Sequence, residues 1–121
     1  MSNEVSYQFQ MLVNNGSMKD QYSSGGLTAN QATAAVLRNV QDILTSATAL
    51  DLGGVVTPGW AMFQNLDLTN YVELGIYDGG IFYPFIKLKA GEQCMLRLTT
   101  ASPVAQANLA TVKLFYIIYA N

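Results

Sequence analysis

The chain contains no histidine, and this absence removes the side chain that enzymes most often use as a general base. Without histidine no Ser-His-Asp or Cys-His arrangement can form, and transition metals lose their most common ligand. The sequence also lacks glycine-rich phosphate loops and any spaced acidic run that resembles an EF-hand. We therefore expect no catalytic residues, no metal site and no cofactor, and we predict that the protein is not an enzyme.

Charged residues are scarce as well, at 12% of the 121 residues, against roughly 25% in a typical soluble domain. Six basic and eight acidic side chains are spread thinly along the chain and form no basic stripe, so no nucleic-acid partner is expected. Half of the residues are apolar. This balance favours a surface that is partly covered by other subunits, with a charge-poor monomer as the alternative.

The sequence has one cysteine, Cys94, which excludes an internal disulfide and is predicted to be a small buried side chain in an apolar strand. The N-terminus has no basic region followed by an apolar run, so no secretory signal is expected. No apolar run approaches the ~18 residues of a membrane span, so no membrane contact is expected. Synthesis in a cytoplasm is the default.

Short apolar segments separated by turn residues fill the stretch from Thr57 to Leu98. They are rich in aromatic and β-branched side chains and are bounded by Gly, Asn and Asp, which is typical of antiparallel hairpins. Strands are predicted at 59–64, 71–76, 82–88 and 93–98. Pro84 cannot donate to a strand ladder, so its strand is predicted at a sheet edge or a bulge. A hairpin around Ala90 would bring together the three cations Lys87, Lys89 and Arg97.

Further strands are predicted on both sides of this stretch. Residues 5–13 alternate between apolar and polar, which predicts a half-buried strand, and Asn14-Asn15-Gly16 reverses the chain into a second strand near 18–23. Residues 112–119 are apolar on both faces, so this strand is either central with both faces covered or carries an interface. The small and polar residues 99–110 are predicted to form a loop.

The segment 28–49 fits two patterns. Its composition favours a helix, and four apolar residues recur at helical spacing. They are Val36, Val40, Ile43 and Leu44. Residues 39–45 also alternate as in a strand. The local pattern favours a helical turn near 32–37, followed by strands at 40–44 and 49–52. The predicted fold class is all-β: one domain over residues 1–121, an antiparallel, jelly-roll-like β-sandwich of about eight short strands.

The last two thirds of the chain contain several distinctive motifs. They are Val40-Gln41-Asp42-Ile43, Ala49-Leu50-Asp51-Leu52-Gly53, Thr57-Pro58-Gly59-Trp60, the segment from Asn65 to Glu73, the segment from Phe82 to Glu92, and Val112-Lys113-Leu114. In these motifs the chain resembles a family of small virion structural proteins of tailed bacteriophages. It departs from the family at Ala47-Thr48, where an acidic pair is usual.

The resemblance implies a structural component of the virion, made in the host cytoplasm. We expect a capsid decoration, or cement, protein that binds the major capsid protein or another virion protein and stabilises the shell. The resemblance favours a homo-oligomer, most often a trimer, for such a protein. A head-to-tail connector, a tail part or a fibre base is the alternative.

Five residues are candidates for the interface: Tyr83 and Phe85 on the edge strand, and Phe115, Ile117 and Tyr119 on the outer face of the last strand. We expect Ile117→Asp to leave a soluble protein that is monomeric or misassembled. A carbohydrate-binding module for host attachment is a further alternative. It requires Trp60, Tyr77 or Tyr83 to be exposed.

Overall fold

The computed structural model describes residues 3–100 and 102–121. All regular secondary structure in this part of the chain is β-strand, and no described helix is long and apolar enough to cross a membrane. The chain divides into two compact units, residues 1–32 and residues 33–121. The predicted sandwich lies entirely within the second unit, which is narrower than the predicted range of 1–121. Whether the two units fold as one domain stays a prediction.

The first unit consists of two pairs of antiparallel strands. They are β1 (Val5–Tyr7) with β4 (Leu27–Ala29), and β2 (Gln10–Asn15) with β3 (Met18–Ser23). The predicted turn at Gly16 and the strand after it are confirmed. The single strand predicted over 5–13 is wrong, because the ladder is interrupted at Phe9, whose N–H donates to Ser24 Oγ. Its predicted half-buried face is found only in part, because Val5, Tyr7 and Val13 are half-buried, whereas Phe9 and Met11 are exposed, at 47% and 66%.

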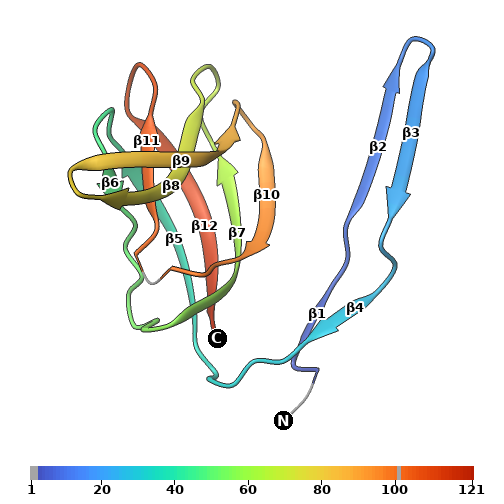
Figure 1. Ribbon diagram of the computed structural model, residues 1–121, viewed down its shortest axis with the longest axis horizontal. Coiled ribbons are helices and arrows are strands. Elements are labelled where there is room, and N and C mark those ends of the chain that lie inside the picture. The colour runs from blue at the N-terminus through green and yellow to red at the C-terminus, as the bar shows by residue number, and fades with distance from the viewer. Residues whose placement is uncertain (1–2, 101) are drawn as a thin grey trace. The chain divides into compact units, whose positions relative to one another are not determined.

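The second unit is an antiparallel β-sandwich of two four-stranded sheets (Figure 1). Sheet I has the order β10-β7-β12-β5, and sheet II has the order β6-β11-β8-β9. The eight strands are β5 (Val36–Ile43), β6 (Thr48–Ala49), β7 (Pro58–Asn65), β8 (Val72–Asp78), β9 (Ile81–Leu88), β10 (Gln93–Arg97), β11 (Val104–Ala107) and β12 (Val112–Ala120). The predicted fold class and the strand number of the sandwich are confirmed.

The pairing of the eight strands is nested. The first strand pairs with the last, β6 with β11, β7 with β10, and β8 with β9. Two further ladders, β12 with β7 and β11 with β8, join these pairs into the two sheets. The sandwich is therefore a long hairpin wrapped into two layers. β12 lies between β7 and β5 within sheet I, but no other strand of the sandwich covers its outer face. Of the two predicted alternatives for this strand, coverage of both faces is thus not found, and the interface stays a prediction.

The core lies between the sheets. β12 contributes the largest share, because Leu114, Tyr116 and Ile118 point inward and are all completely buried. Phe63 of β7 joins them from the same sheet, and its ring lies 6.1 Å from that of Tyr116. Sheet II contributes smaller side chains to this core, which are Val72, Leu74, Leu88, Ala105 and Ala107.

Three local predictions are wrong, each because pairing between distant segments overrides the local pattern. The helical turn near 32–37 is absent, and β5 begins at Val36 because its backbone pairs with β12 along its whole length. The predicted loop 99–110 contains β11, whose small residues fit beside β8. The segment around Ala90 does not form the predicted hairpin. It connects β9 of sheet II with β10 of sheet I.

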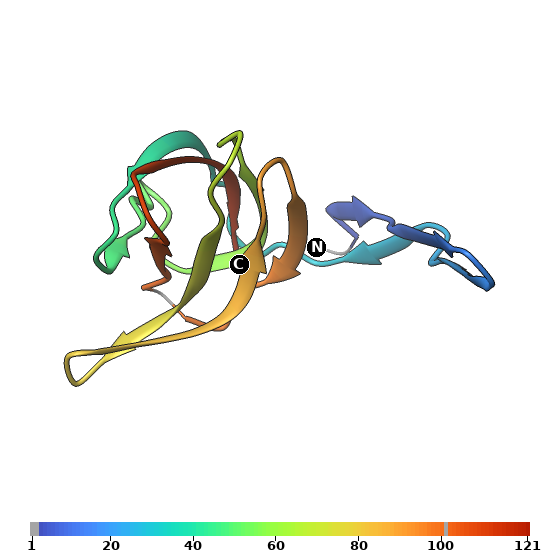
Figure 2. The same cartoon turned by 90° about the horizontal axis from the view of Figure 1, so that it is seen from above.

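The β8–β9 hairpin continues beyond its sheet. β11 pairs with β8 only from Val72 to Gly75, so the remainder of the hairpin is two-stranded and extends clear of the other sandwich strands (Figure 2). We call this part, residues 76–83, the hairpin tip. Its turn residues Gly79 and Gly80 have φ values of 59° and 81°, the signs that a type I′ turn requires. The turn predicted at this position is thus confirmed.

Candidate functional site

The outer face of sheet I is largely apolar, with Gln64 and Gln93 as uncharged polar members, and no other strand of the sandwich covers it. We call this surface the apolar face. Its members alternate with the core residues along the four strands and are Val36, Val40, Trp60, Met62, Met95, Phe115, Ile117 and Tyr119. Three of them are strongly exposed, at 54% for Val36, 51% for Val40 and 41% for Met95. A sheet face of this composition is typical of a surface that contacts another molecule.

Cations border the apolar face. Arg38 is exposed beside Ile117, and none of the described acidic residues forms an ion pair with it. Lys113 is paired with Asp42 at 2.9 Å, and the guanidinium carbon of Arg97 lies 5.4 Å from the Trp60 ring centroid. The basic side chains thus surround an apolar centre, which is the usual anatomy of a protein interface.

Three of the five predicted interface residues belong to the apolar face. Phe115 and Tyr119 are half-buried there, and Ile117 is only 9% exposed because its neighbours already cover it. Its substitution by Asp would therefore disturb the packing of the single chain as well as any contact. Val36, Val40 and Met95, which the sequence analysis did not select, offer more accessible surface.

The other two predicted residues, Tyr83 and Phe85, lie on β9 in sheet II, so the structure does not place all five in one site. Both are exposed, Phe85 at 79%. Phe85 is the extra residue of a β-bulge, because Leu74 pairs with Ile86 while the next residue, Gly75, pairs with Pro84. The prediction that Pro84 marks an edge or a bulge is confirmed on both counts.

Gly75 makes this bulge possible. A Cβ at this position would collide with the carbonyl oxygen of Tyr83 and with Pro84, so the β9 backbone approaches β8 more closely than any side chain allows. The bulge shifts the alternation of β9 by one residue and leaves the Phe85 side chain facing solvent.

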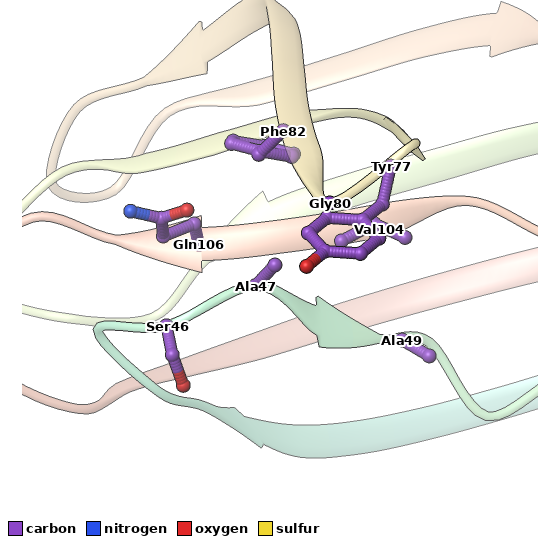
Figure 3. A pocket seen from close by; sticks show the side chains of 8 residues that line it. All are labelled: Ser46, Ala47, Ala49, Tyr77, Gly80, Phe82, Val104 and Gln106. Carbon is purple, nitrogen blue, oxygen red and sulfur yellow. The ribbon is translucent and has the colours of Figure 1, made fainter.

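A cleft of about 480 Å³ lies against sheet II (Figure 3). The hairpin tip forms one wall with Tyr77, Gly80 and Phe82. Val104 and Gln106 of β11 form a second wall, and the segment before and within β6 closes the third with Ser46, Ala47 and Ala49. Val104 is 7% exposed although it does not belong to the core between the sheets. The cleft is thus a hollow on the outside of the sandwich.

The polar side chains of this cleft have no partners within the described residues. The Tyr77 hydroxyl, the Gln106 amide and the Ser46 hydroxyl form no side-chain hydrogen bond there. No charged residue lines the cleft. Tyr77 is one of the residues whose exposure a sugar site requires, and at 53% it is exposed.

No family model, no curated protein and no solved structure matches this chain. The resemblance to small virion proteins of tailed bacteriophages therefore stays a prediction.

The motif that begins at Asn65 holds a loop together. Asn65 is fully buried at the end of β7, and its amide donates to the carbonyl oxygens of Asn70 and Leu88 at 2.9 and 3.0 Å. The Asp67 carboxylate accepts the backbone N–H groups of Asn70 and Thr69 at 2.6 and 3.0 Å, and these bonds lower its pKa. Oδ2 of this acidic residue is thus engaged by the backbone, and the described residues contain no cluster of metal-ligating groups.

The Val-Gln-x-Ile motif is likewise structural. Gln41 donates to the carbonyl of Ala49 at 2.9 Å and accepts the N–H of Asp51 at 2.9 Å, which fixes the segment between β6 and β7 to β5. The Tyr116 hydroxyl lies 2.7 Å from the carbonyl oxygen of Asp51 and accepts from the Asn39 amide at 3.1 Å. Burial raises the pKa of this phenol.

Cys94 and Trp60 are both less accessible than a reactive or sugar-stacking role would need. Cys94 is half-buried in β10 and forms no disulfide within the described residues, and burial raises the pKa of its thiol above the usual value. Trp60 is half-buried beside Arg97. The exposed aromatic side chains of the sandwich lie instead on β8 and β9.

Proposed function

We propose that this protein is a non-enzymatic structural protein that binds neighbouring protein subunits through the apolar face of sheet I, and that it serves as a decoration protein on a virus shell. The observation that carries the proposal is the exposure of Val36, Val40 and Met95 on a sheet face with no further layer of the sandwich above it. Burying such a face contributes roughly 25 cal/mol for each Å² of apolar area removed from water.

The nature of the face supports binding to protein. Residues that pair across neighbouring strands form rows of side chains over all four strands, so the surface is continuous and rigid. One such row consists of Met95, Met62, Ile117 and Arg38. Aromatic, methionine and arginine side chains are all enriched at protein interfaces. On a shell, many copies of one modest contact add up to a large stabilisation.

The strand order also supports the proposal. We interpret the nested pairing of β5 to β12 as jelly-roll-like, and the jelly roll is an architecture that occurs in viral capsid proteins and in lectins. A fold alone does not define a function, so this support is secondary to the apolar face.

The first test is the copy number of the protein in purified virus particles, measured by quantitative mass spectrometry relative to the major capsid protein. Hundreds of copies per particle are the expected result. A few to a few dozen copies would overturn decoration in favour of a neck, tail or fibre-base role. The absence of the protein would overturn the virion role.

The second test addresses the face itself. Val40→Asp places a charge at an exposed position of the apolar face, whereas Leu68→Asp places the same charge on a loop residue that is 95% exposed. We expect Val40→Asp to weaken attachment to particles, or self-association measured by light scattering, while Leu68→Asp behaves as the wild type. Equal behaviour of the two variants would contradict the assignment of this face.

A further inference from the structure

We propose that the cleft between the hairpin tip and β11 binds a neutral saccharide. The site is separate from the apolar face, because it lies on sheet II and shares no residue with it. Its volume of about 480 Å³ is within the range of small-molecule sites. The proposal does not depend on the virion role.

The aromatic residues of the cleft supply an apolar platform. Tyr77 and Phe82 pair with each other across β8 and β9, so their side chains lie on the same face of the hairpin and both line the cleft. A pyranose ring presents C–H groups on its faces, and an aromatic ring is a rigid surface on which they can pack. The turn glycine Gly80 leaves the end of this platform open, since it carries no side chain.

The polar residues supply the groups that recognise hydroxyls. The Gln106 amide offers both donors and an acceptor, and the Tyr77 hydroxyl can donate or accept. Because these two groups form no side-chain hydrogen bonds within the described residues, they are available to a ligand. They come from two different walls of the cleft, whereas the Ser46 hydroxyl points away from them in Figure 3.

The absence of charge among the lining residues selects the class of ligand. Phosphorylated, sulfated or sialylated compounds would need a cation, and none lines the cleft. A purely apolar ligand would leave the Tyr77 hydroxyl and the Gln106 amide without partners, at a cost in binding free energy. A neutral sugar matches both the platform and the hydroxyl-binding groups.

The experiment is a glycan array probed with the labelled full-length protein. The array carries oligosaccharides that end in glucose, galactose, mannose or N-acetylglucosamine, together with sialylated and sulfated versions of the same structures. We expect binding to at least one series of neutral oligosaccharides. The sialylated and sulfated versions of the same structures should bind no more tightly. The hit is then titrated by calorimetry with the wild type and with the variants below.

Tyr77→Ala removes the platform, and we expect about a tenfold loss of affinity. Gln106→Leu keeps the approximate size of the side chain and removes its hydrogen bonds, with a similar expected loss. Tyr83→Ala is the matched control, because Tyr83 is an equally exposed tyrosine on the same hairpin but pairs with Ile76 and lies on the opposite face. It should bind as the wild type does.

Three results would overturn the proposal. They are a wild type that binds no glycan on the array, an equal loss in Tyr77→Ala and Tyr83→Ala, and a loss that occurs in Trp60→Ala but not in Tyr77→Ala. If Tyr77→Ala fails to fold by circular dichroism, Gln106→Leu decides in its place. Capture of a protein segment in the cleft without any glycan binding would also count against the saccharide.

Discussion

The β2–β3 hairpin and the β8–β9 hairpin have similar turns and different surroundings. Each turns through two residues, the first of which is a glycine of positive φ. In β2–β3 every strand residue is exposed or half-buried, and Met11 and Tyr22 are 66% and 57% exposed. In β8–β9 the half that pairs with β11 is buried, and only the tip resembles β2–β3.

The difference shows that the turn residues of a hairpin reverse the chain, and that pairing with further strands is what buries its side chains. A two-stranded ribbon is marginally stable in water, because it has no second layer that removes its apolar side chains from solvent. Phe9 and Tyr22 therefore contact mainly each other, with ring centroids 5.6 Å apart. Leu74, in contrast, belongs to a core that both sheets build.

The largest effect is expected where the anchored hairpin enters the core. Leu74 is 3% exposed, and Leu74→Ala should lower the free energy of unfolding by about 2–5 kcal/mol, measured by urea denaturation with Trp60 fluorescence. Ile76→Ala is the control, since Ile76 lies two residues further along the same face and is 44% exposed. Equal losses in the two variants would remove the distinction between the anchored half and the tip.

The next effect concerns the close approach of the two strands. Gly75→Ala places a methyl group against the Tyr83 carbonyl, and the bulge must shift, at a cost of about 1–3 kcal/mol. Gly26→Ala is the comparison in the first unit, where nothing lies within 4 Å of the added group. We expect that variant to unfold at the same urea concentration as the wild type. A tolerated Gly75→Ala would contradict the bulge.

A smaller effect is expected from Asp67, in the loop that leads into β8. Backbone hydrogen bonds lower the pKa of this carboxyl below its usual value of 3.8, so its stabilisation is present above that pH and is lost as the pH falls through the lowered pKa. Asp67→Asn should therefore be less stable than the wild type at neutral pH, and the difference should shrink below pH 3.8. Urea midpoints across this range provide the measurement. A difference that does not change with pH would argue against the carboxylate as the cause.

The smallest effect is expected in the exposed hairpin of the first unit. Met11→Ser removes an exposed apolar side chain and should change the free energy of unfolding of the sandwich by less than about 0.5 kcal/mol. The same urea titration measures it. A loss comparable to that of Leu74→Ala would show that Met11 is buried in solution, and the comparison of the two hairpins would then have to be abandoned.

The sequence was sufficient to predict the fold class and most strands of the sandwich, because turn residues such as Gly79 act locally and Pro84 restricts its own strand to an edge or a bulge. It was insufficient wherever a distant partner decides the structure. The residues of β5 have a helical pattern but form a strand because they pair with β12, and the small residues of β11 form a strand because they pair with β8. The alternation in residues 5–13 could not reveal that Phe9 and Met11 are exposed.

The predicted surface residues show the same difference between local patterns and pairing with distant strands. Phe115 and Tyr119 were placed on the correct face, because alternation along β12 defines its two sides. The contribution of Val36, Val40 and Met95 to that face was missed, since it depends on which strands are neighbours. Ser46, Gln106 and the hairpin tip line the same cleft although they are far apart in the sequence. No spacing in the sequence indicates that these segments lie close together.

The nested pairing of the sandwich also bears on how quickly the protein can fold. Contacts such as that between Asp42 and Lys113 join residues that are 71 positions apart, and chains with many such contacts fold slowly. During synthesis on the ribosome, β5 and β7 must wait for β12 before sheet I can close between them. Until then their backbone edges are open to pairing with other chains, so the newly made protein is most exposed to aggregation just before its last strand emerges.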